Sequence, residues 1–225
     1  KSEGMIEAKD FSKKISDKGI DSVLNFSNEI DIVIDCSSAT SHQKHAPLLK
    51  KAKLPVIDMT PSGIGKSIIP AVNLGECKDL ENINLVSCGG QSSIPILYKW
   101  KKTLKNYGVN LNYVEVVSTI STVSAGMATR RNIDNYLKNT ENAITEFCEC
   151  ESKVILNVNP ANPPVTMRTS FSALLDNEES FDINWRDETF KIESLIKEYI
   201  PGYRITVLPQ IIDRKRLFSS ALIKG

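Results

Sequence analysis

The stretch Val86-Ser87-Cys88-Gly89-Gly90-Gln91-Ser92-Ser93-Ile94-Pro95 separates two different patterns in the chain. The apolar run at residues 83–87 predicts a buried strand, and residues 94–107 predict a helix with Pro95 in its first turn, where proline is tolerated. A cysteine therefore stands at the end of a strand, and Gly89 and Gly90 permit tight backbone turns before the helix. We place a domain boundary directly after Cys88.

Strand and helix signals alternate before this boundary. Residues 31–36 and 54–59 are short apolar runs typical of buried parallel strands, with a helix expected at about 42–52 between them. This order predicts an α/β fold with a Rossmann-like parallel sheet. Because the chain has no Gly-x-Gly-x-x-Gly, we expect the first strand and its phosphate-binding loop to lie upstream of Lys1. Residues 1–88 are thus expected to form a partial dinucleotide-binding domain.

The pattern after Cys88 is of the α+β kind. Helices are expected at 132–150 and 188–199, and strands at 111–122, 153–158, 166–175, 203–208 and 216–223. Strands that follow one another in this way favour a mostly antiparallel sheet. Residues 89–225 are expected to form the second domain.

The composition excludes several classes of protein. A formal net charge of +1 argues against a general nucleic-acid binder, and no apolar run is long enough to span a bilayer. The five cysteines are odd in number, and their spacing matches no zinc signature. We therefore expect a reduced, cytoplasmic protein without a metal site.

Cys88 is the candidate nucleophile. The first turn of a helix carries unpaired N–H groups and a partial positive charge, which lower the pKa of a thiol placed there. The same N–H groups could hold the oxyanion of a tetrahedral adduct. The alternative is a buried structural cysteine, which is the usual role of a free cysteine.

Hydroxyl side chains follow the first predicted strand. Ser37, Ser38 and Thr40 lie where open parallel sheets bind nucleotides, beyond the carboxyl end of a strand. They could donate hydrogen bonds to a nucleotide, or they could serve only as the cap of the next helix.

Several motifs of the chain resemble acylating (CoA-dependent) acetaldehyde dehydrogenases. Cys88-Gly89-Gly90-Gln91 with the following Ile94-Pro95 is similar to the nucleophile region of that family. Further matches, in chain order, are Asp35 with the serines after it, Ile57-Asp58-Met59-Thr60-Pro61, Val72-Asn73-Leu74, Ser124–Asp134, Asn159-Pro160-Ala161-Asn162-Pro163-Pro164 with Met167-Arg168, and Tyr199-Ile200-Pro201-Gly202-Tyr203-Arg204.

The resemblance implies a Rossmann domain followed by a catalytic and oligomerisation domain like that of glyceraldehyde-3-phosphate dehydrogenase. It also implies that Cys88 forms an acyl thioester, with a short-chain aldehyde and CoA as substrates. A homo-oligomer and an aldolase partner are further implications. The implied cofactor is NAD, NADP not being excluded, and it would contact Ser124, Ala125, Gly126, Met127, Ala128, Thr129, Arg130, Arg131 and Asn132. By itself that segment also suits a helix-capping loop with a solvated arginine pair.

The sequence departs from the family pattern in two places. Met127-Ala128 replaces the family's Pro-Gly, and Thr169 stands where the family has an acidic residue. If that carboxylate assists the cysteine, another must replace it here, and Asp176 and Asp182 are candidates.

Two other functions remain open on the sequence. One is a phosphorylating or semialdehyde dehydrogenase of the same fold, and the other is a non-catalytic nucleotide-binding relative. Phosphorylating and semialdehyde dehydrogenases generally place a histidine beside the cysteine, whereas His42 and His45, the only two histidines, precede Cys88. CoA is itself a thiol and needs no such base, so the pattern favours CoA as the acyl acceptor.

Overall fold

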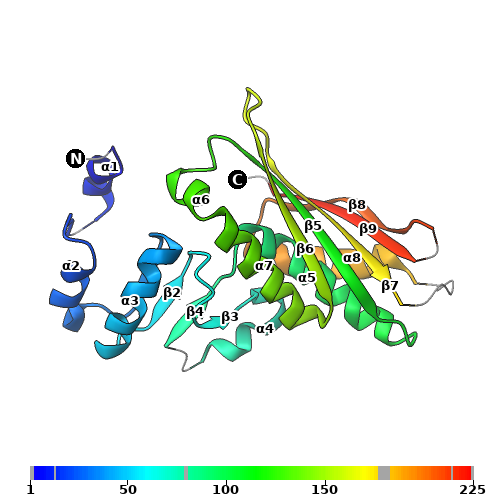
Figure 1. The fold of residues 1–225 in the computed structure, drawn as a ribbon, viewed down its shortest axis with the longest axis horizontal. Helices are drawn as coiled ribbons and strands as arrows, with labels where there is room; N and C mark the ends of the chain where they lie inside the picture. Colours follow the sequence, from blue (N-terminus) through cyan, green and yellow to red (C-terminus); the bar gives the residue numbers. More distant parts are fainter. Residues whose placement is uncertain (1–2, 13, 79–80, 177–182, 214, 224–225) are drawn as a thin grey trace.

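The computed structural model describes residues 3–12, 14–78, 81–176, 183–213 and 215–223, which contain two β-sheets (Figure 1). The first sheet has the order β1-β2-β4-β3, and every neighbouring pair is parallel. Its strands are β1 (Val33–Asp35), β2 (Val56–Asp58), β3 (Lys66–Ser67) and β4 (Asn82–Asn84). The helices of this half are α1 (Glu3–Phe11), α2 (Ile20–Asn25), α3 (Ala39–Lys51) and α4 (Pro70–Asn73), with short 3₁₀ turns at Ser27–Glu29 and Leu74–Cys77.

The second sheet has the order β6-β5-β7-β9-β8, in which only the β5–β6 pair is parallel. Its strands are β5 (Leu111–Ser121), β6 (Glu151–Asn159), β7 (Met167–Leu175), β8 (Tyr203–Ile211) and β9 (Arg216–Ile223). The helices are α5 (Cys88–Lys105), α6 (Met127–Arg131), α7 (Ile133–Cys148) and α8 (Trp185–Lys197). The expected mostly antiparallel sheet is therefore present.

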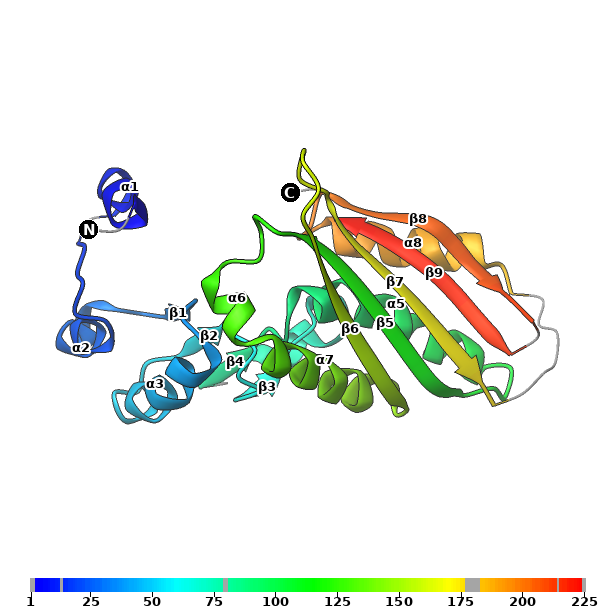
Figure 2. The same ribbon diagram turned by 45° about the horizontal axis from the view of Figure 1, so that its top comes forward.

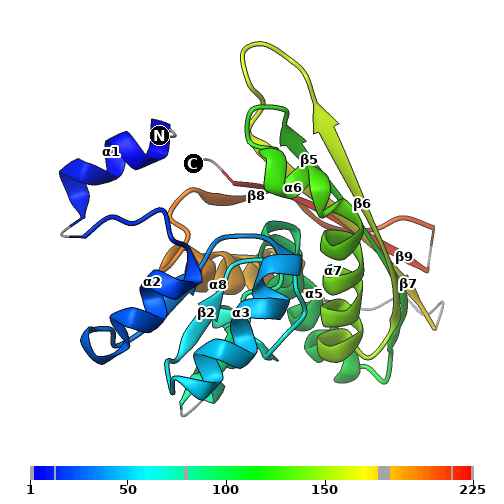
Figure 3. The same cartoon turned by 60° about the vertical axis from the view of Figure 1, so that its left-hand side comes forward.

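Helices α5, α7 and α8 lie on one face of the second sheet (Figures 2 and 3). The apolar positions of α5 recur every three or four residues, which places them on one side of the helix. Ile94, Leu97, Trp100 and Leu104 are each at most 2% exposed, and the Trp100 ring lies 5.3 Å from that of Phe171 on β7. Each such side chain stabilises the fold by about 1.5–3 kcal/mol through burial. The opposite face of the sheet is open in the part of the chain that the structure describes.

Helix α5 begins earlier than the sequence pattern predicted. Its first residue is Cys88, and Pro95 lies inside the helix and not in its first turn. The reason is that Ser87 caps the helix, its Oγ accepting a hydrogen bond of 3.0 Å from the N–H of Gly90. Gly89 and Gly90 are poor helix formers, so their sequence indicated a turn.

The predicted strand before Cys88 also ends early, at Asn84, because the backbone turns sharply at Val86. Val86 has a φ of 62°, a left-handed conformation that is rare for a β-branched residue. Its N–H donates to Asn84 Oδ1 at 2.6 Å, and its carbonyl accepts from Asn139 Nδ2 at 2.9 Å. Since Asn139 lies on α7, this turn is held from both halves of the molecule.

We predict that Asn139→Leu lowers the free energy of unfolding by about 1–3 kcal/mol, because the buried Val86 carbonyl loses its donor. Urea unfolding followed by circular dichroism measures the change. Asn135→Leu on the same helix is the matched control, and we expect it to shift stability by less than about 0.5 kcal/mol. Equal effects of the two substitutions would show that Asn139 has no special role at the turn.

Candidate active site

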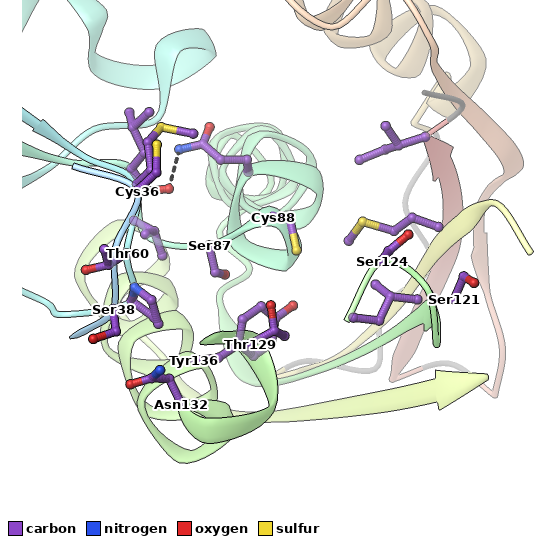
Figure 4. A pocket seen from close by; sticks show the side chains of 18 of the residues that line it. Cys36, Ser38, Thr60, Ser87, Cys88, Ser121, Ser124, Thr129, Asn132 and Tyr136 are labelled. Carbon is purple, nitrogen blue, oxygen red and sulfur yellow. Dashed lines mark hydrogen bonds between the residues drawn. The ribbon is translucent and has the colours of Figure 1, made fainter. Parts of the chain in front are cut away.

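A cavity of about 860 Å³ lies where the two halves of the chain meet (Figure 4). One wall follows the carboxyl ends of β1 and β2, the position at which open parallel sheets bind ligands. The other walls come from the start of α5, the junction of α6 and α7, and the start of β7. The residues that line it include Ser37, Ser38, Thr60, Cys88, Gln91, Ser124, Thr129, Asn132, Tyr136 and Met167.

Cys88 is exposed to this cavity as the first residue of α5 (Figure 4). The structure therefore places the predicted nucleophile on the cavity wall. The other free cysteine on the cavity wall is Cys36, after β1.

The expected net lowering of the Cys88 pKa is wrong for this structure. Burial in the surrounding protein raises the pKa of the Cys88 thiol, and this effect exceeds the lowering by the Tyr136 hydroxyl and by the backbone N–H groups of Gly89 and Cys88. The N–H groups at the helix start lower the pKa of the thiol, as the sequence predicted, but desolvation of the thiolate raises this pKa by more.

Tyr136 is a site residue that the sequence did not predict, although it lies four residues after Asn132 and a spacing of four residues places side chains on one helix face. Its hydroxyl lies against the first turn of α5: a Cβ on Gly89 would stand 2.1 Å from Tyr136 Oη and 2.8 Å from Ser118 Oγ. No side chain larger than hydrogen fits there. Gly89 therefore allows α7 to approach the nucleophile.

Asp35 organises the wall formed by β1 and α3. Its carboxylate accepts hydrogen bonds from the backbone N–H and hydroxyl of Ser37 at 3.0 and 2.5 Å. The Nδ1 atoms of His42 and His45 lie 2.9 and 2.8 Å from Asp35 Oδ2. His42 is fully buried, and its Nε2 lies 3.5 Å from Asp58 Oδ2 at the end of β2. This cluster fixes the ends of two strands beside the cavity.

The segment from Ser124 to Asn132 is brought only partly to the cavity. Ser124, Thr129 and Asn132 line it. Arg130 instead holds the loop together, its Nε donating to the Ala125 carbonyl at 2.8 Å. Among the other described members of the predicted set, Ala125, Gly126, Met127 and Arg131 are not lining residues, and Met127 is 65% exposed.

The cavity fits a nucleotide in its chemistry. Ser38 is one of the three hydroxyl residues predicted beyond the first strand, and it is the N-cap of α3. Its Oγ accepts a hydrogen bond from Ser41 N at 3.1 Å. Nearby, the buried Thr60 Oγ1 has no hydrogen-bond partner among the described residues. Apolar side chains of Met59 and Leu85 complete this wall, as is usual in cofactor sites.

The described residues contain no cluster of histidine, cysteine or acidic side chains that could hold a metal ion. Within the same residues, every helix is too short or too polar to cross a membrane.

The family model for the dimerisation domain of prokaryotic acetaldehyde dehydrogenase matches residues 88–219. An acetaldehyde dehydrogenase from Pectobacterium atrosepticum is 39% identical over 100% of this chain and 74% of its own length. The chain belongs to the acetaldehyde dehydrogenase family. A relative from Carboxydothermus hydrogenoformans is 37% identical, again over 100% of this chain and 72% of the relative. The chain spans 63% of the length of acetaldehyde dehydrogenase 2 from Salinispora arenicola, to which it is 38% identical over 85% of its own residues. The predicted family is thereby confirmed.

Solved structures confirm the fold class. Aspartate semialdehyde dehydrogenase II from Vibrio cholerae aligns over 86% of this chain and 74% of its own, with a TM-score of 0.56 and 11% identity. A probable aspartate-semialdehyde dehydrogenase from Pseudomonas aeruginosa aligns over 88% and 75%, with a TM-score of 0.52 and 9% identity. The predicted α/β chain with a Rossmann-like sheet and a second dehydrogenase domain is therefore the observed architecture. At such identities the likeness concerns the fold alone.

Thr169 stands where the acetaldehyde dehydrogenase family has an acidic residue, and the structure shows which of the candidate carboxylates could replace that residue beside Cys88. Thr169 is buried, with its Oγ1 2.8 Å from Ser92 Oγ and 3.3 Å from Ser118 Oγ. Asp176 lies beyond the far end of β7, about 30 Å along the strand from Met167, and accepts hydrogen bonds from Asn110. It is therefore excluded as the partner of Cys88, and Asp182 lies outside the described residues.

We predict that stability decreases as the pH falls from about 4 towards 2, in part because Asp35 becomes protonated. Burial raises the pKa of Asp35, but hydrogen bonds from Ser37, His42 and His45 outweigh it and lower the pKa from 3.8 to about 2. A carboxylate with a depressed folded-state pKa stabilises the fold above its unfolded pKa and loses that contribution below it. Urea unfolding at a series of pH values measures the slope.

Asp35→Asn should flatten this slope, whereas substitution of the exposed Asp31 by Asn should leave it unchanged. A wild-type slope in Asp35→Asn would contradict the assignment.

Proposed function

We propose that this chain is part of an NAD-dependent, CoA-acylating aldehyde dehydrogenase that interconverts a short-chain aldehyde plus CoA with the acyl-CoA. The observation that carries the proposal is the position of Cys88 at the N-terminus of α5, on the wall of a cavity whose other wall is the carboxyl edge of a parallel sheet. Membership of the acetaldehyde dehydrogenase family supports it.

In the oxidative direction, Cys88 loses its thiol proton to solvent and the thiolate attacks the aldehyde carbonyl carbon. The C–S bond forms as the carbonyl electron pair moves to oxygen, and N–H groups at the start of α5 are the proposed donors to that oxyanion. Bound NAD would supply the acceptor for the hydride that leaves this carbon. The C=O bond re-forms as the hydride leaves, so that Cys88 carries the acyl group as a thioester. The thiolate of CoA then attacks the thioester carbonyl and displaces the Cys88 thiolate.

The residues proposed to hold the cofactor belong to both halves of the molecule. Ser37, Ser38 and Thr60 lie beyond β1 and β2, and Ser124, Thr129 and Asn132 lie across the cavity from them. Their hydroxyl and amide groups can pair with ribose or phosphate oxygens, while apolar walls suit the flat rings.

The choice of acyl acceptor rests on what surrounds Cys88. His42 and His45 are held by Asp35, and neither lines the cavity in the described structure. Attack by phosphate or water on a thioester benefits from a general base, whereas a CoA thiolate is already a strong nucleophile. This environment favours CoA.

Self-association is a further part of the proposal. The matching family model describes a dimerisation domain, and the open face of the second sheet carries half-exposed apolar side chains such as Ile155 and Leu174, 38% and 39% exposed. A second copy could cover that face. An aldolase partner is proposed only on the resemblance stated above.

We predict that Cys88→Ala in the full-length protein lowers the rate of acyl-CoA reduction by NADH more than about a thousandfold, because the attacking atom is lost. The assay follows NADH absorbance. Cys77→Ala, a partly exposed cysteine outside the cavity, is the matched control and should retain activity. Normal turnover in Cys88→Ala with a native circular-dichroism spectrum would refute the thioester mechanism.

We also predict that aldehyde oxidation requires CoA and that inorganic phosphate does not replace it. The measurement is NADH formation from acetaldehyde and NAD with CoA, with phosphate and with neither. Turnover with phosphate alone would assign the protein to the phosphorylating class instead.

A further inference from the structure

The hydroxyl of Tyr136 is a buried polar group without a hydrogen-bond partner of regular geometry among the described residues. Buried polar atoms in native proteins are nearly always paired, so each exception calls for a reason. This hydroxyl is next to a nucleophile that must become an anion. A donor without a hydrogen-bond partner of regular geometry in the resting protein is available to that anion.

The position of the hydroxyl is fixed by close packing. The 2.1 Å distance from a Cβ built on Gly89 to Tyr136 Oη means that the phenol reaches the backbone of the residue that follows Cys88. Both Tyr136 and Cys88 line the cavity, from α7 and α5 respectively (Figure 4). The Tyr136 hydroxyl is close enough to the Cys88 sulfur to lower the pKa of the thiol.

Buried hydroxyl groups form a row that begins next to the Tyr136 phenol. Ser118 Oγ interacts with Tyr136 Oη, and the row continues to Thr169 Oγ1 at 3.3 Å and Ser92 Oγ at 2.8 Å. All three residues are at most 1% exposed. A hydroxyl can accept from one neighbour and donate to another, so this row can accommodate a Tyr136 proton that points towards Cys88.

The surroundings of Cys88 contain few other groups that could stabilise a negative charge. The described residues that line the cavity from β1, β2, α5, α6, α7, β5, β7 and β9 include no aspartate, glutamate, histidine, lysine or arginine. The titratable groups among them are Cys36, Cys88 and Tyr136. Burial raises the pKa of Tyr136 well above its usual range, which favours the protonated phenol as a hydrogen-bond donor.

We propose that Tyr136 is a catalytic residue, which donates its phenolic hydrogen bond to the Cys88 thiolate and so supplies stabilisation that no charged side chain among the described lining residues provides. When the Cys88 proton leaves to solvent, Tyr136 keeps its own proton and turns it towards sulfur. No bond to carbon forms at Tyr136. The inference rests on the proposed function, in which this thiolate is the nucleophile.

The test is the pH dependence of Cys88 alkylation by iodoacetamide in the full-length protein, quantified for the Cys88 peptide by mass spectrometry. Tyr136→Phe should raise the midpoint by about one to two pH units, the size expected for losing a hydrogen bond to a charged group. The limiting rate at high pH, where the thiolate is complete, should stay unchanged. Tyr98→Phe, a half-buried tyrosine of α5 outside the cavity, is the control and should keep the wild-type midpoint.

A merely structural role for Tyr136 would change the rate at all pH values and leave the midpoint in place, and that result would overturn the proposal. Ser118→Ala provides a second variant, expected to shift the midpoint in the same direction by loosening the phenol. An unchanged midpoint in both variants also overturns it. Alkylation needs neither aldehyde nor CoA, so a wild-type protein that fails to reduce acyl-CoA but shows these shifts would refute the proposed function and leave the role of Tyr136 standing.

Discussion

The backbone of Val86 leaves β4 in the left-handed region with a φ of 62°, and this turn sets the direction in which α5 starts. A β-branched residue adopts such a conformation only when its surroundings enforce it. Here the enforcement comes from Asn84 on one side and from Asn139 of α7 on the other. Because the turn is anchored on both halves of the chain, the first residue of α5 is held at the junction where the cavity opens. The position of Cys88 is thus a consequence of a backbone constraint and not of contacts made by the cysteine itself.

Close packing around the helix start explains the electrostatic character of the site. Gly90 lies so near Val86 that a Cβ there would stand 2.8 Å from Val86 Cγ1, and Gly89 is equally crowded by Tyr136. Such packing brings donors to the sulfur and removes water from it at the same time. The two effects on the Cys88 pKa oppose each other, and desolvation is the larger. A substrate or cofactor that replaces the remaining water would strengthen every hydrogen bond donated to the thiolate, since interactions in a low dielectric are stronger.

The two walls of the cavity are stabilised in different ways. On the parallel-sheet side, Asp35 and Asp58 are joined through the buried His42, so that charged and polar groups fix the strand ends. On the other side, an apolar core built around Trp100 and Phe171 fixes α5 against the second sheet. Polar groups on the first wall suit the sugar and phosphate groups of a nucleotide, whereas the second wall carries Cys88, the proposed nucleophile.

The sequence by itself determined the family, the candidate nucleophile and the order of the longer elements. Apolar runs predicted the strands of both sheets except the two-residue β3, since burial of one or both faces dictates their period. Cys88 was identifiable as a candidate because its neighbours form a local motif. The start of α5 was placed too late, because the Ser87 cap overrides the low helix propensity of Gly89 and Gly90. Tertiary structure alone decided that Tyr136 faces Cys88, that Arg130 holds a loop while Ser124, Thr129 and Asn132 line the cavity, and that Asp176 lies far from the site. The physical reason is that burial, hydrogen-bond partners and the pKa of a thiol depend on atoms distant in sequence, whereas helix and strand patterns depend on neighbours along the chain.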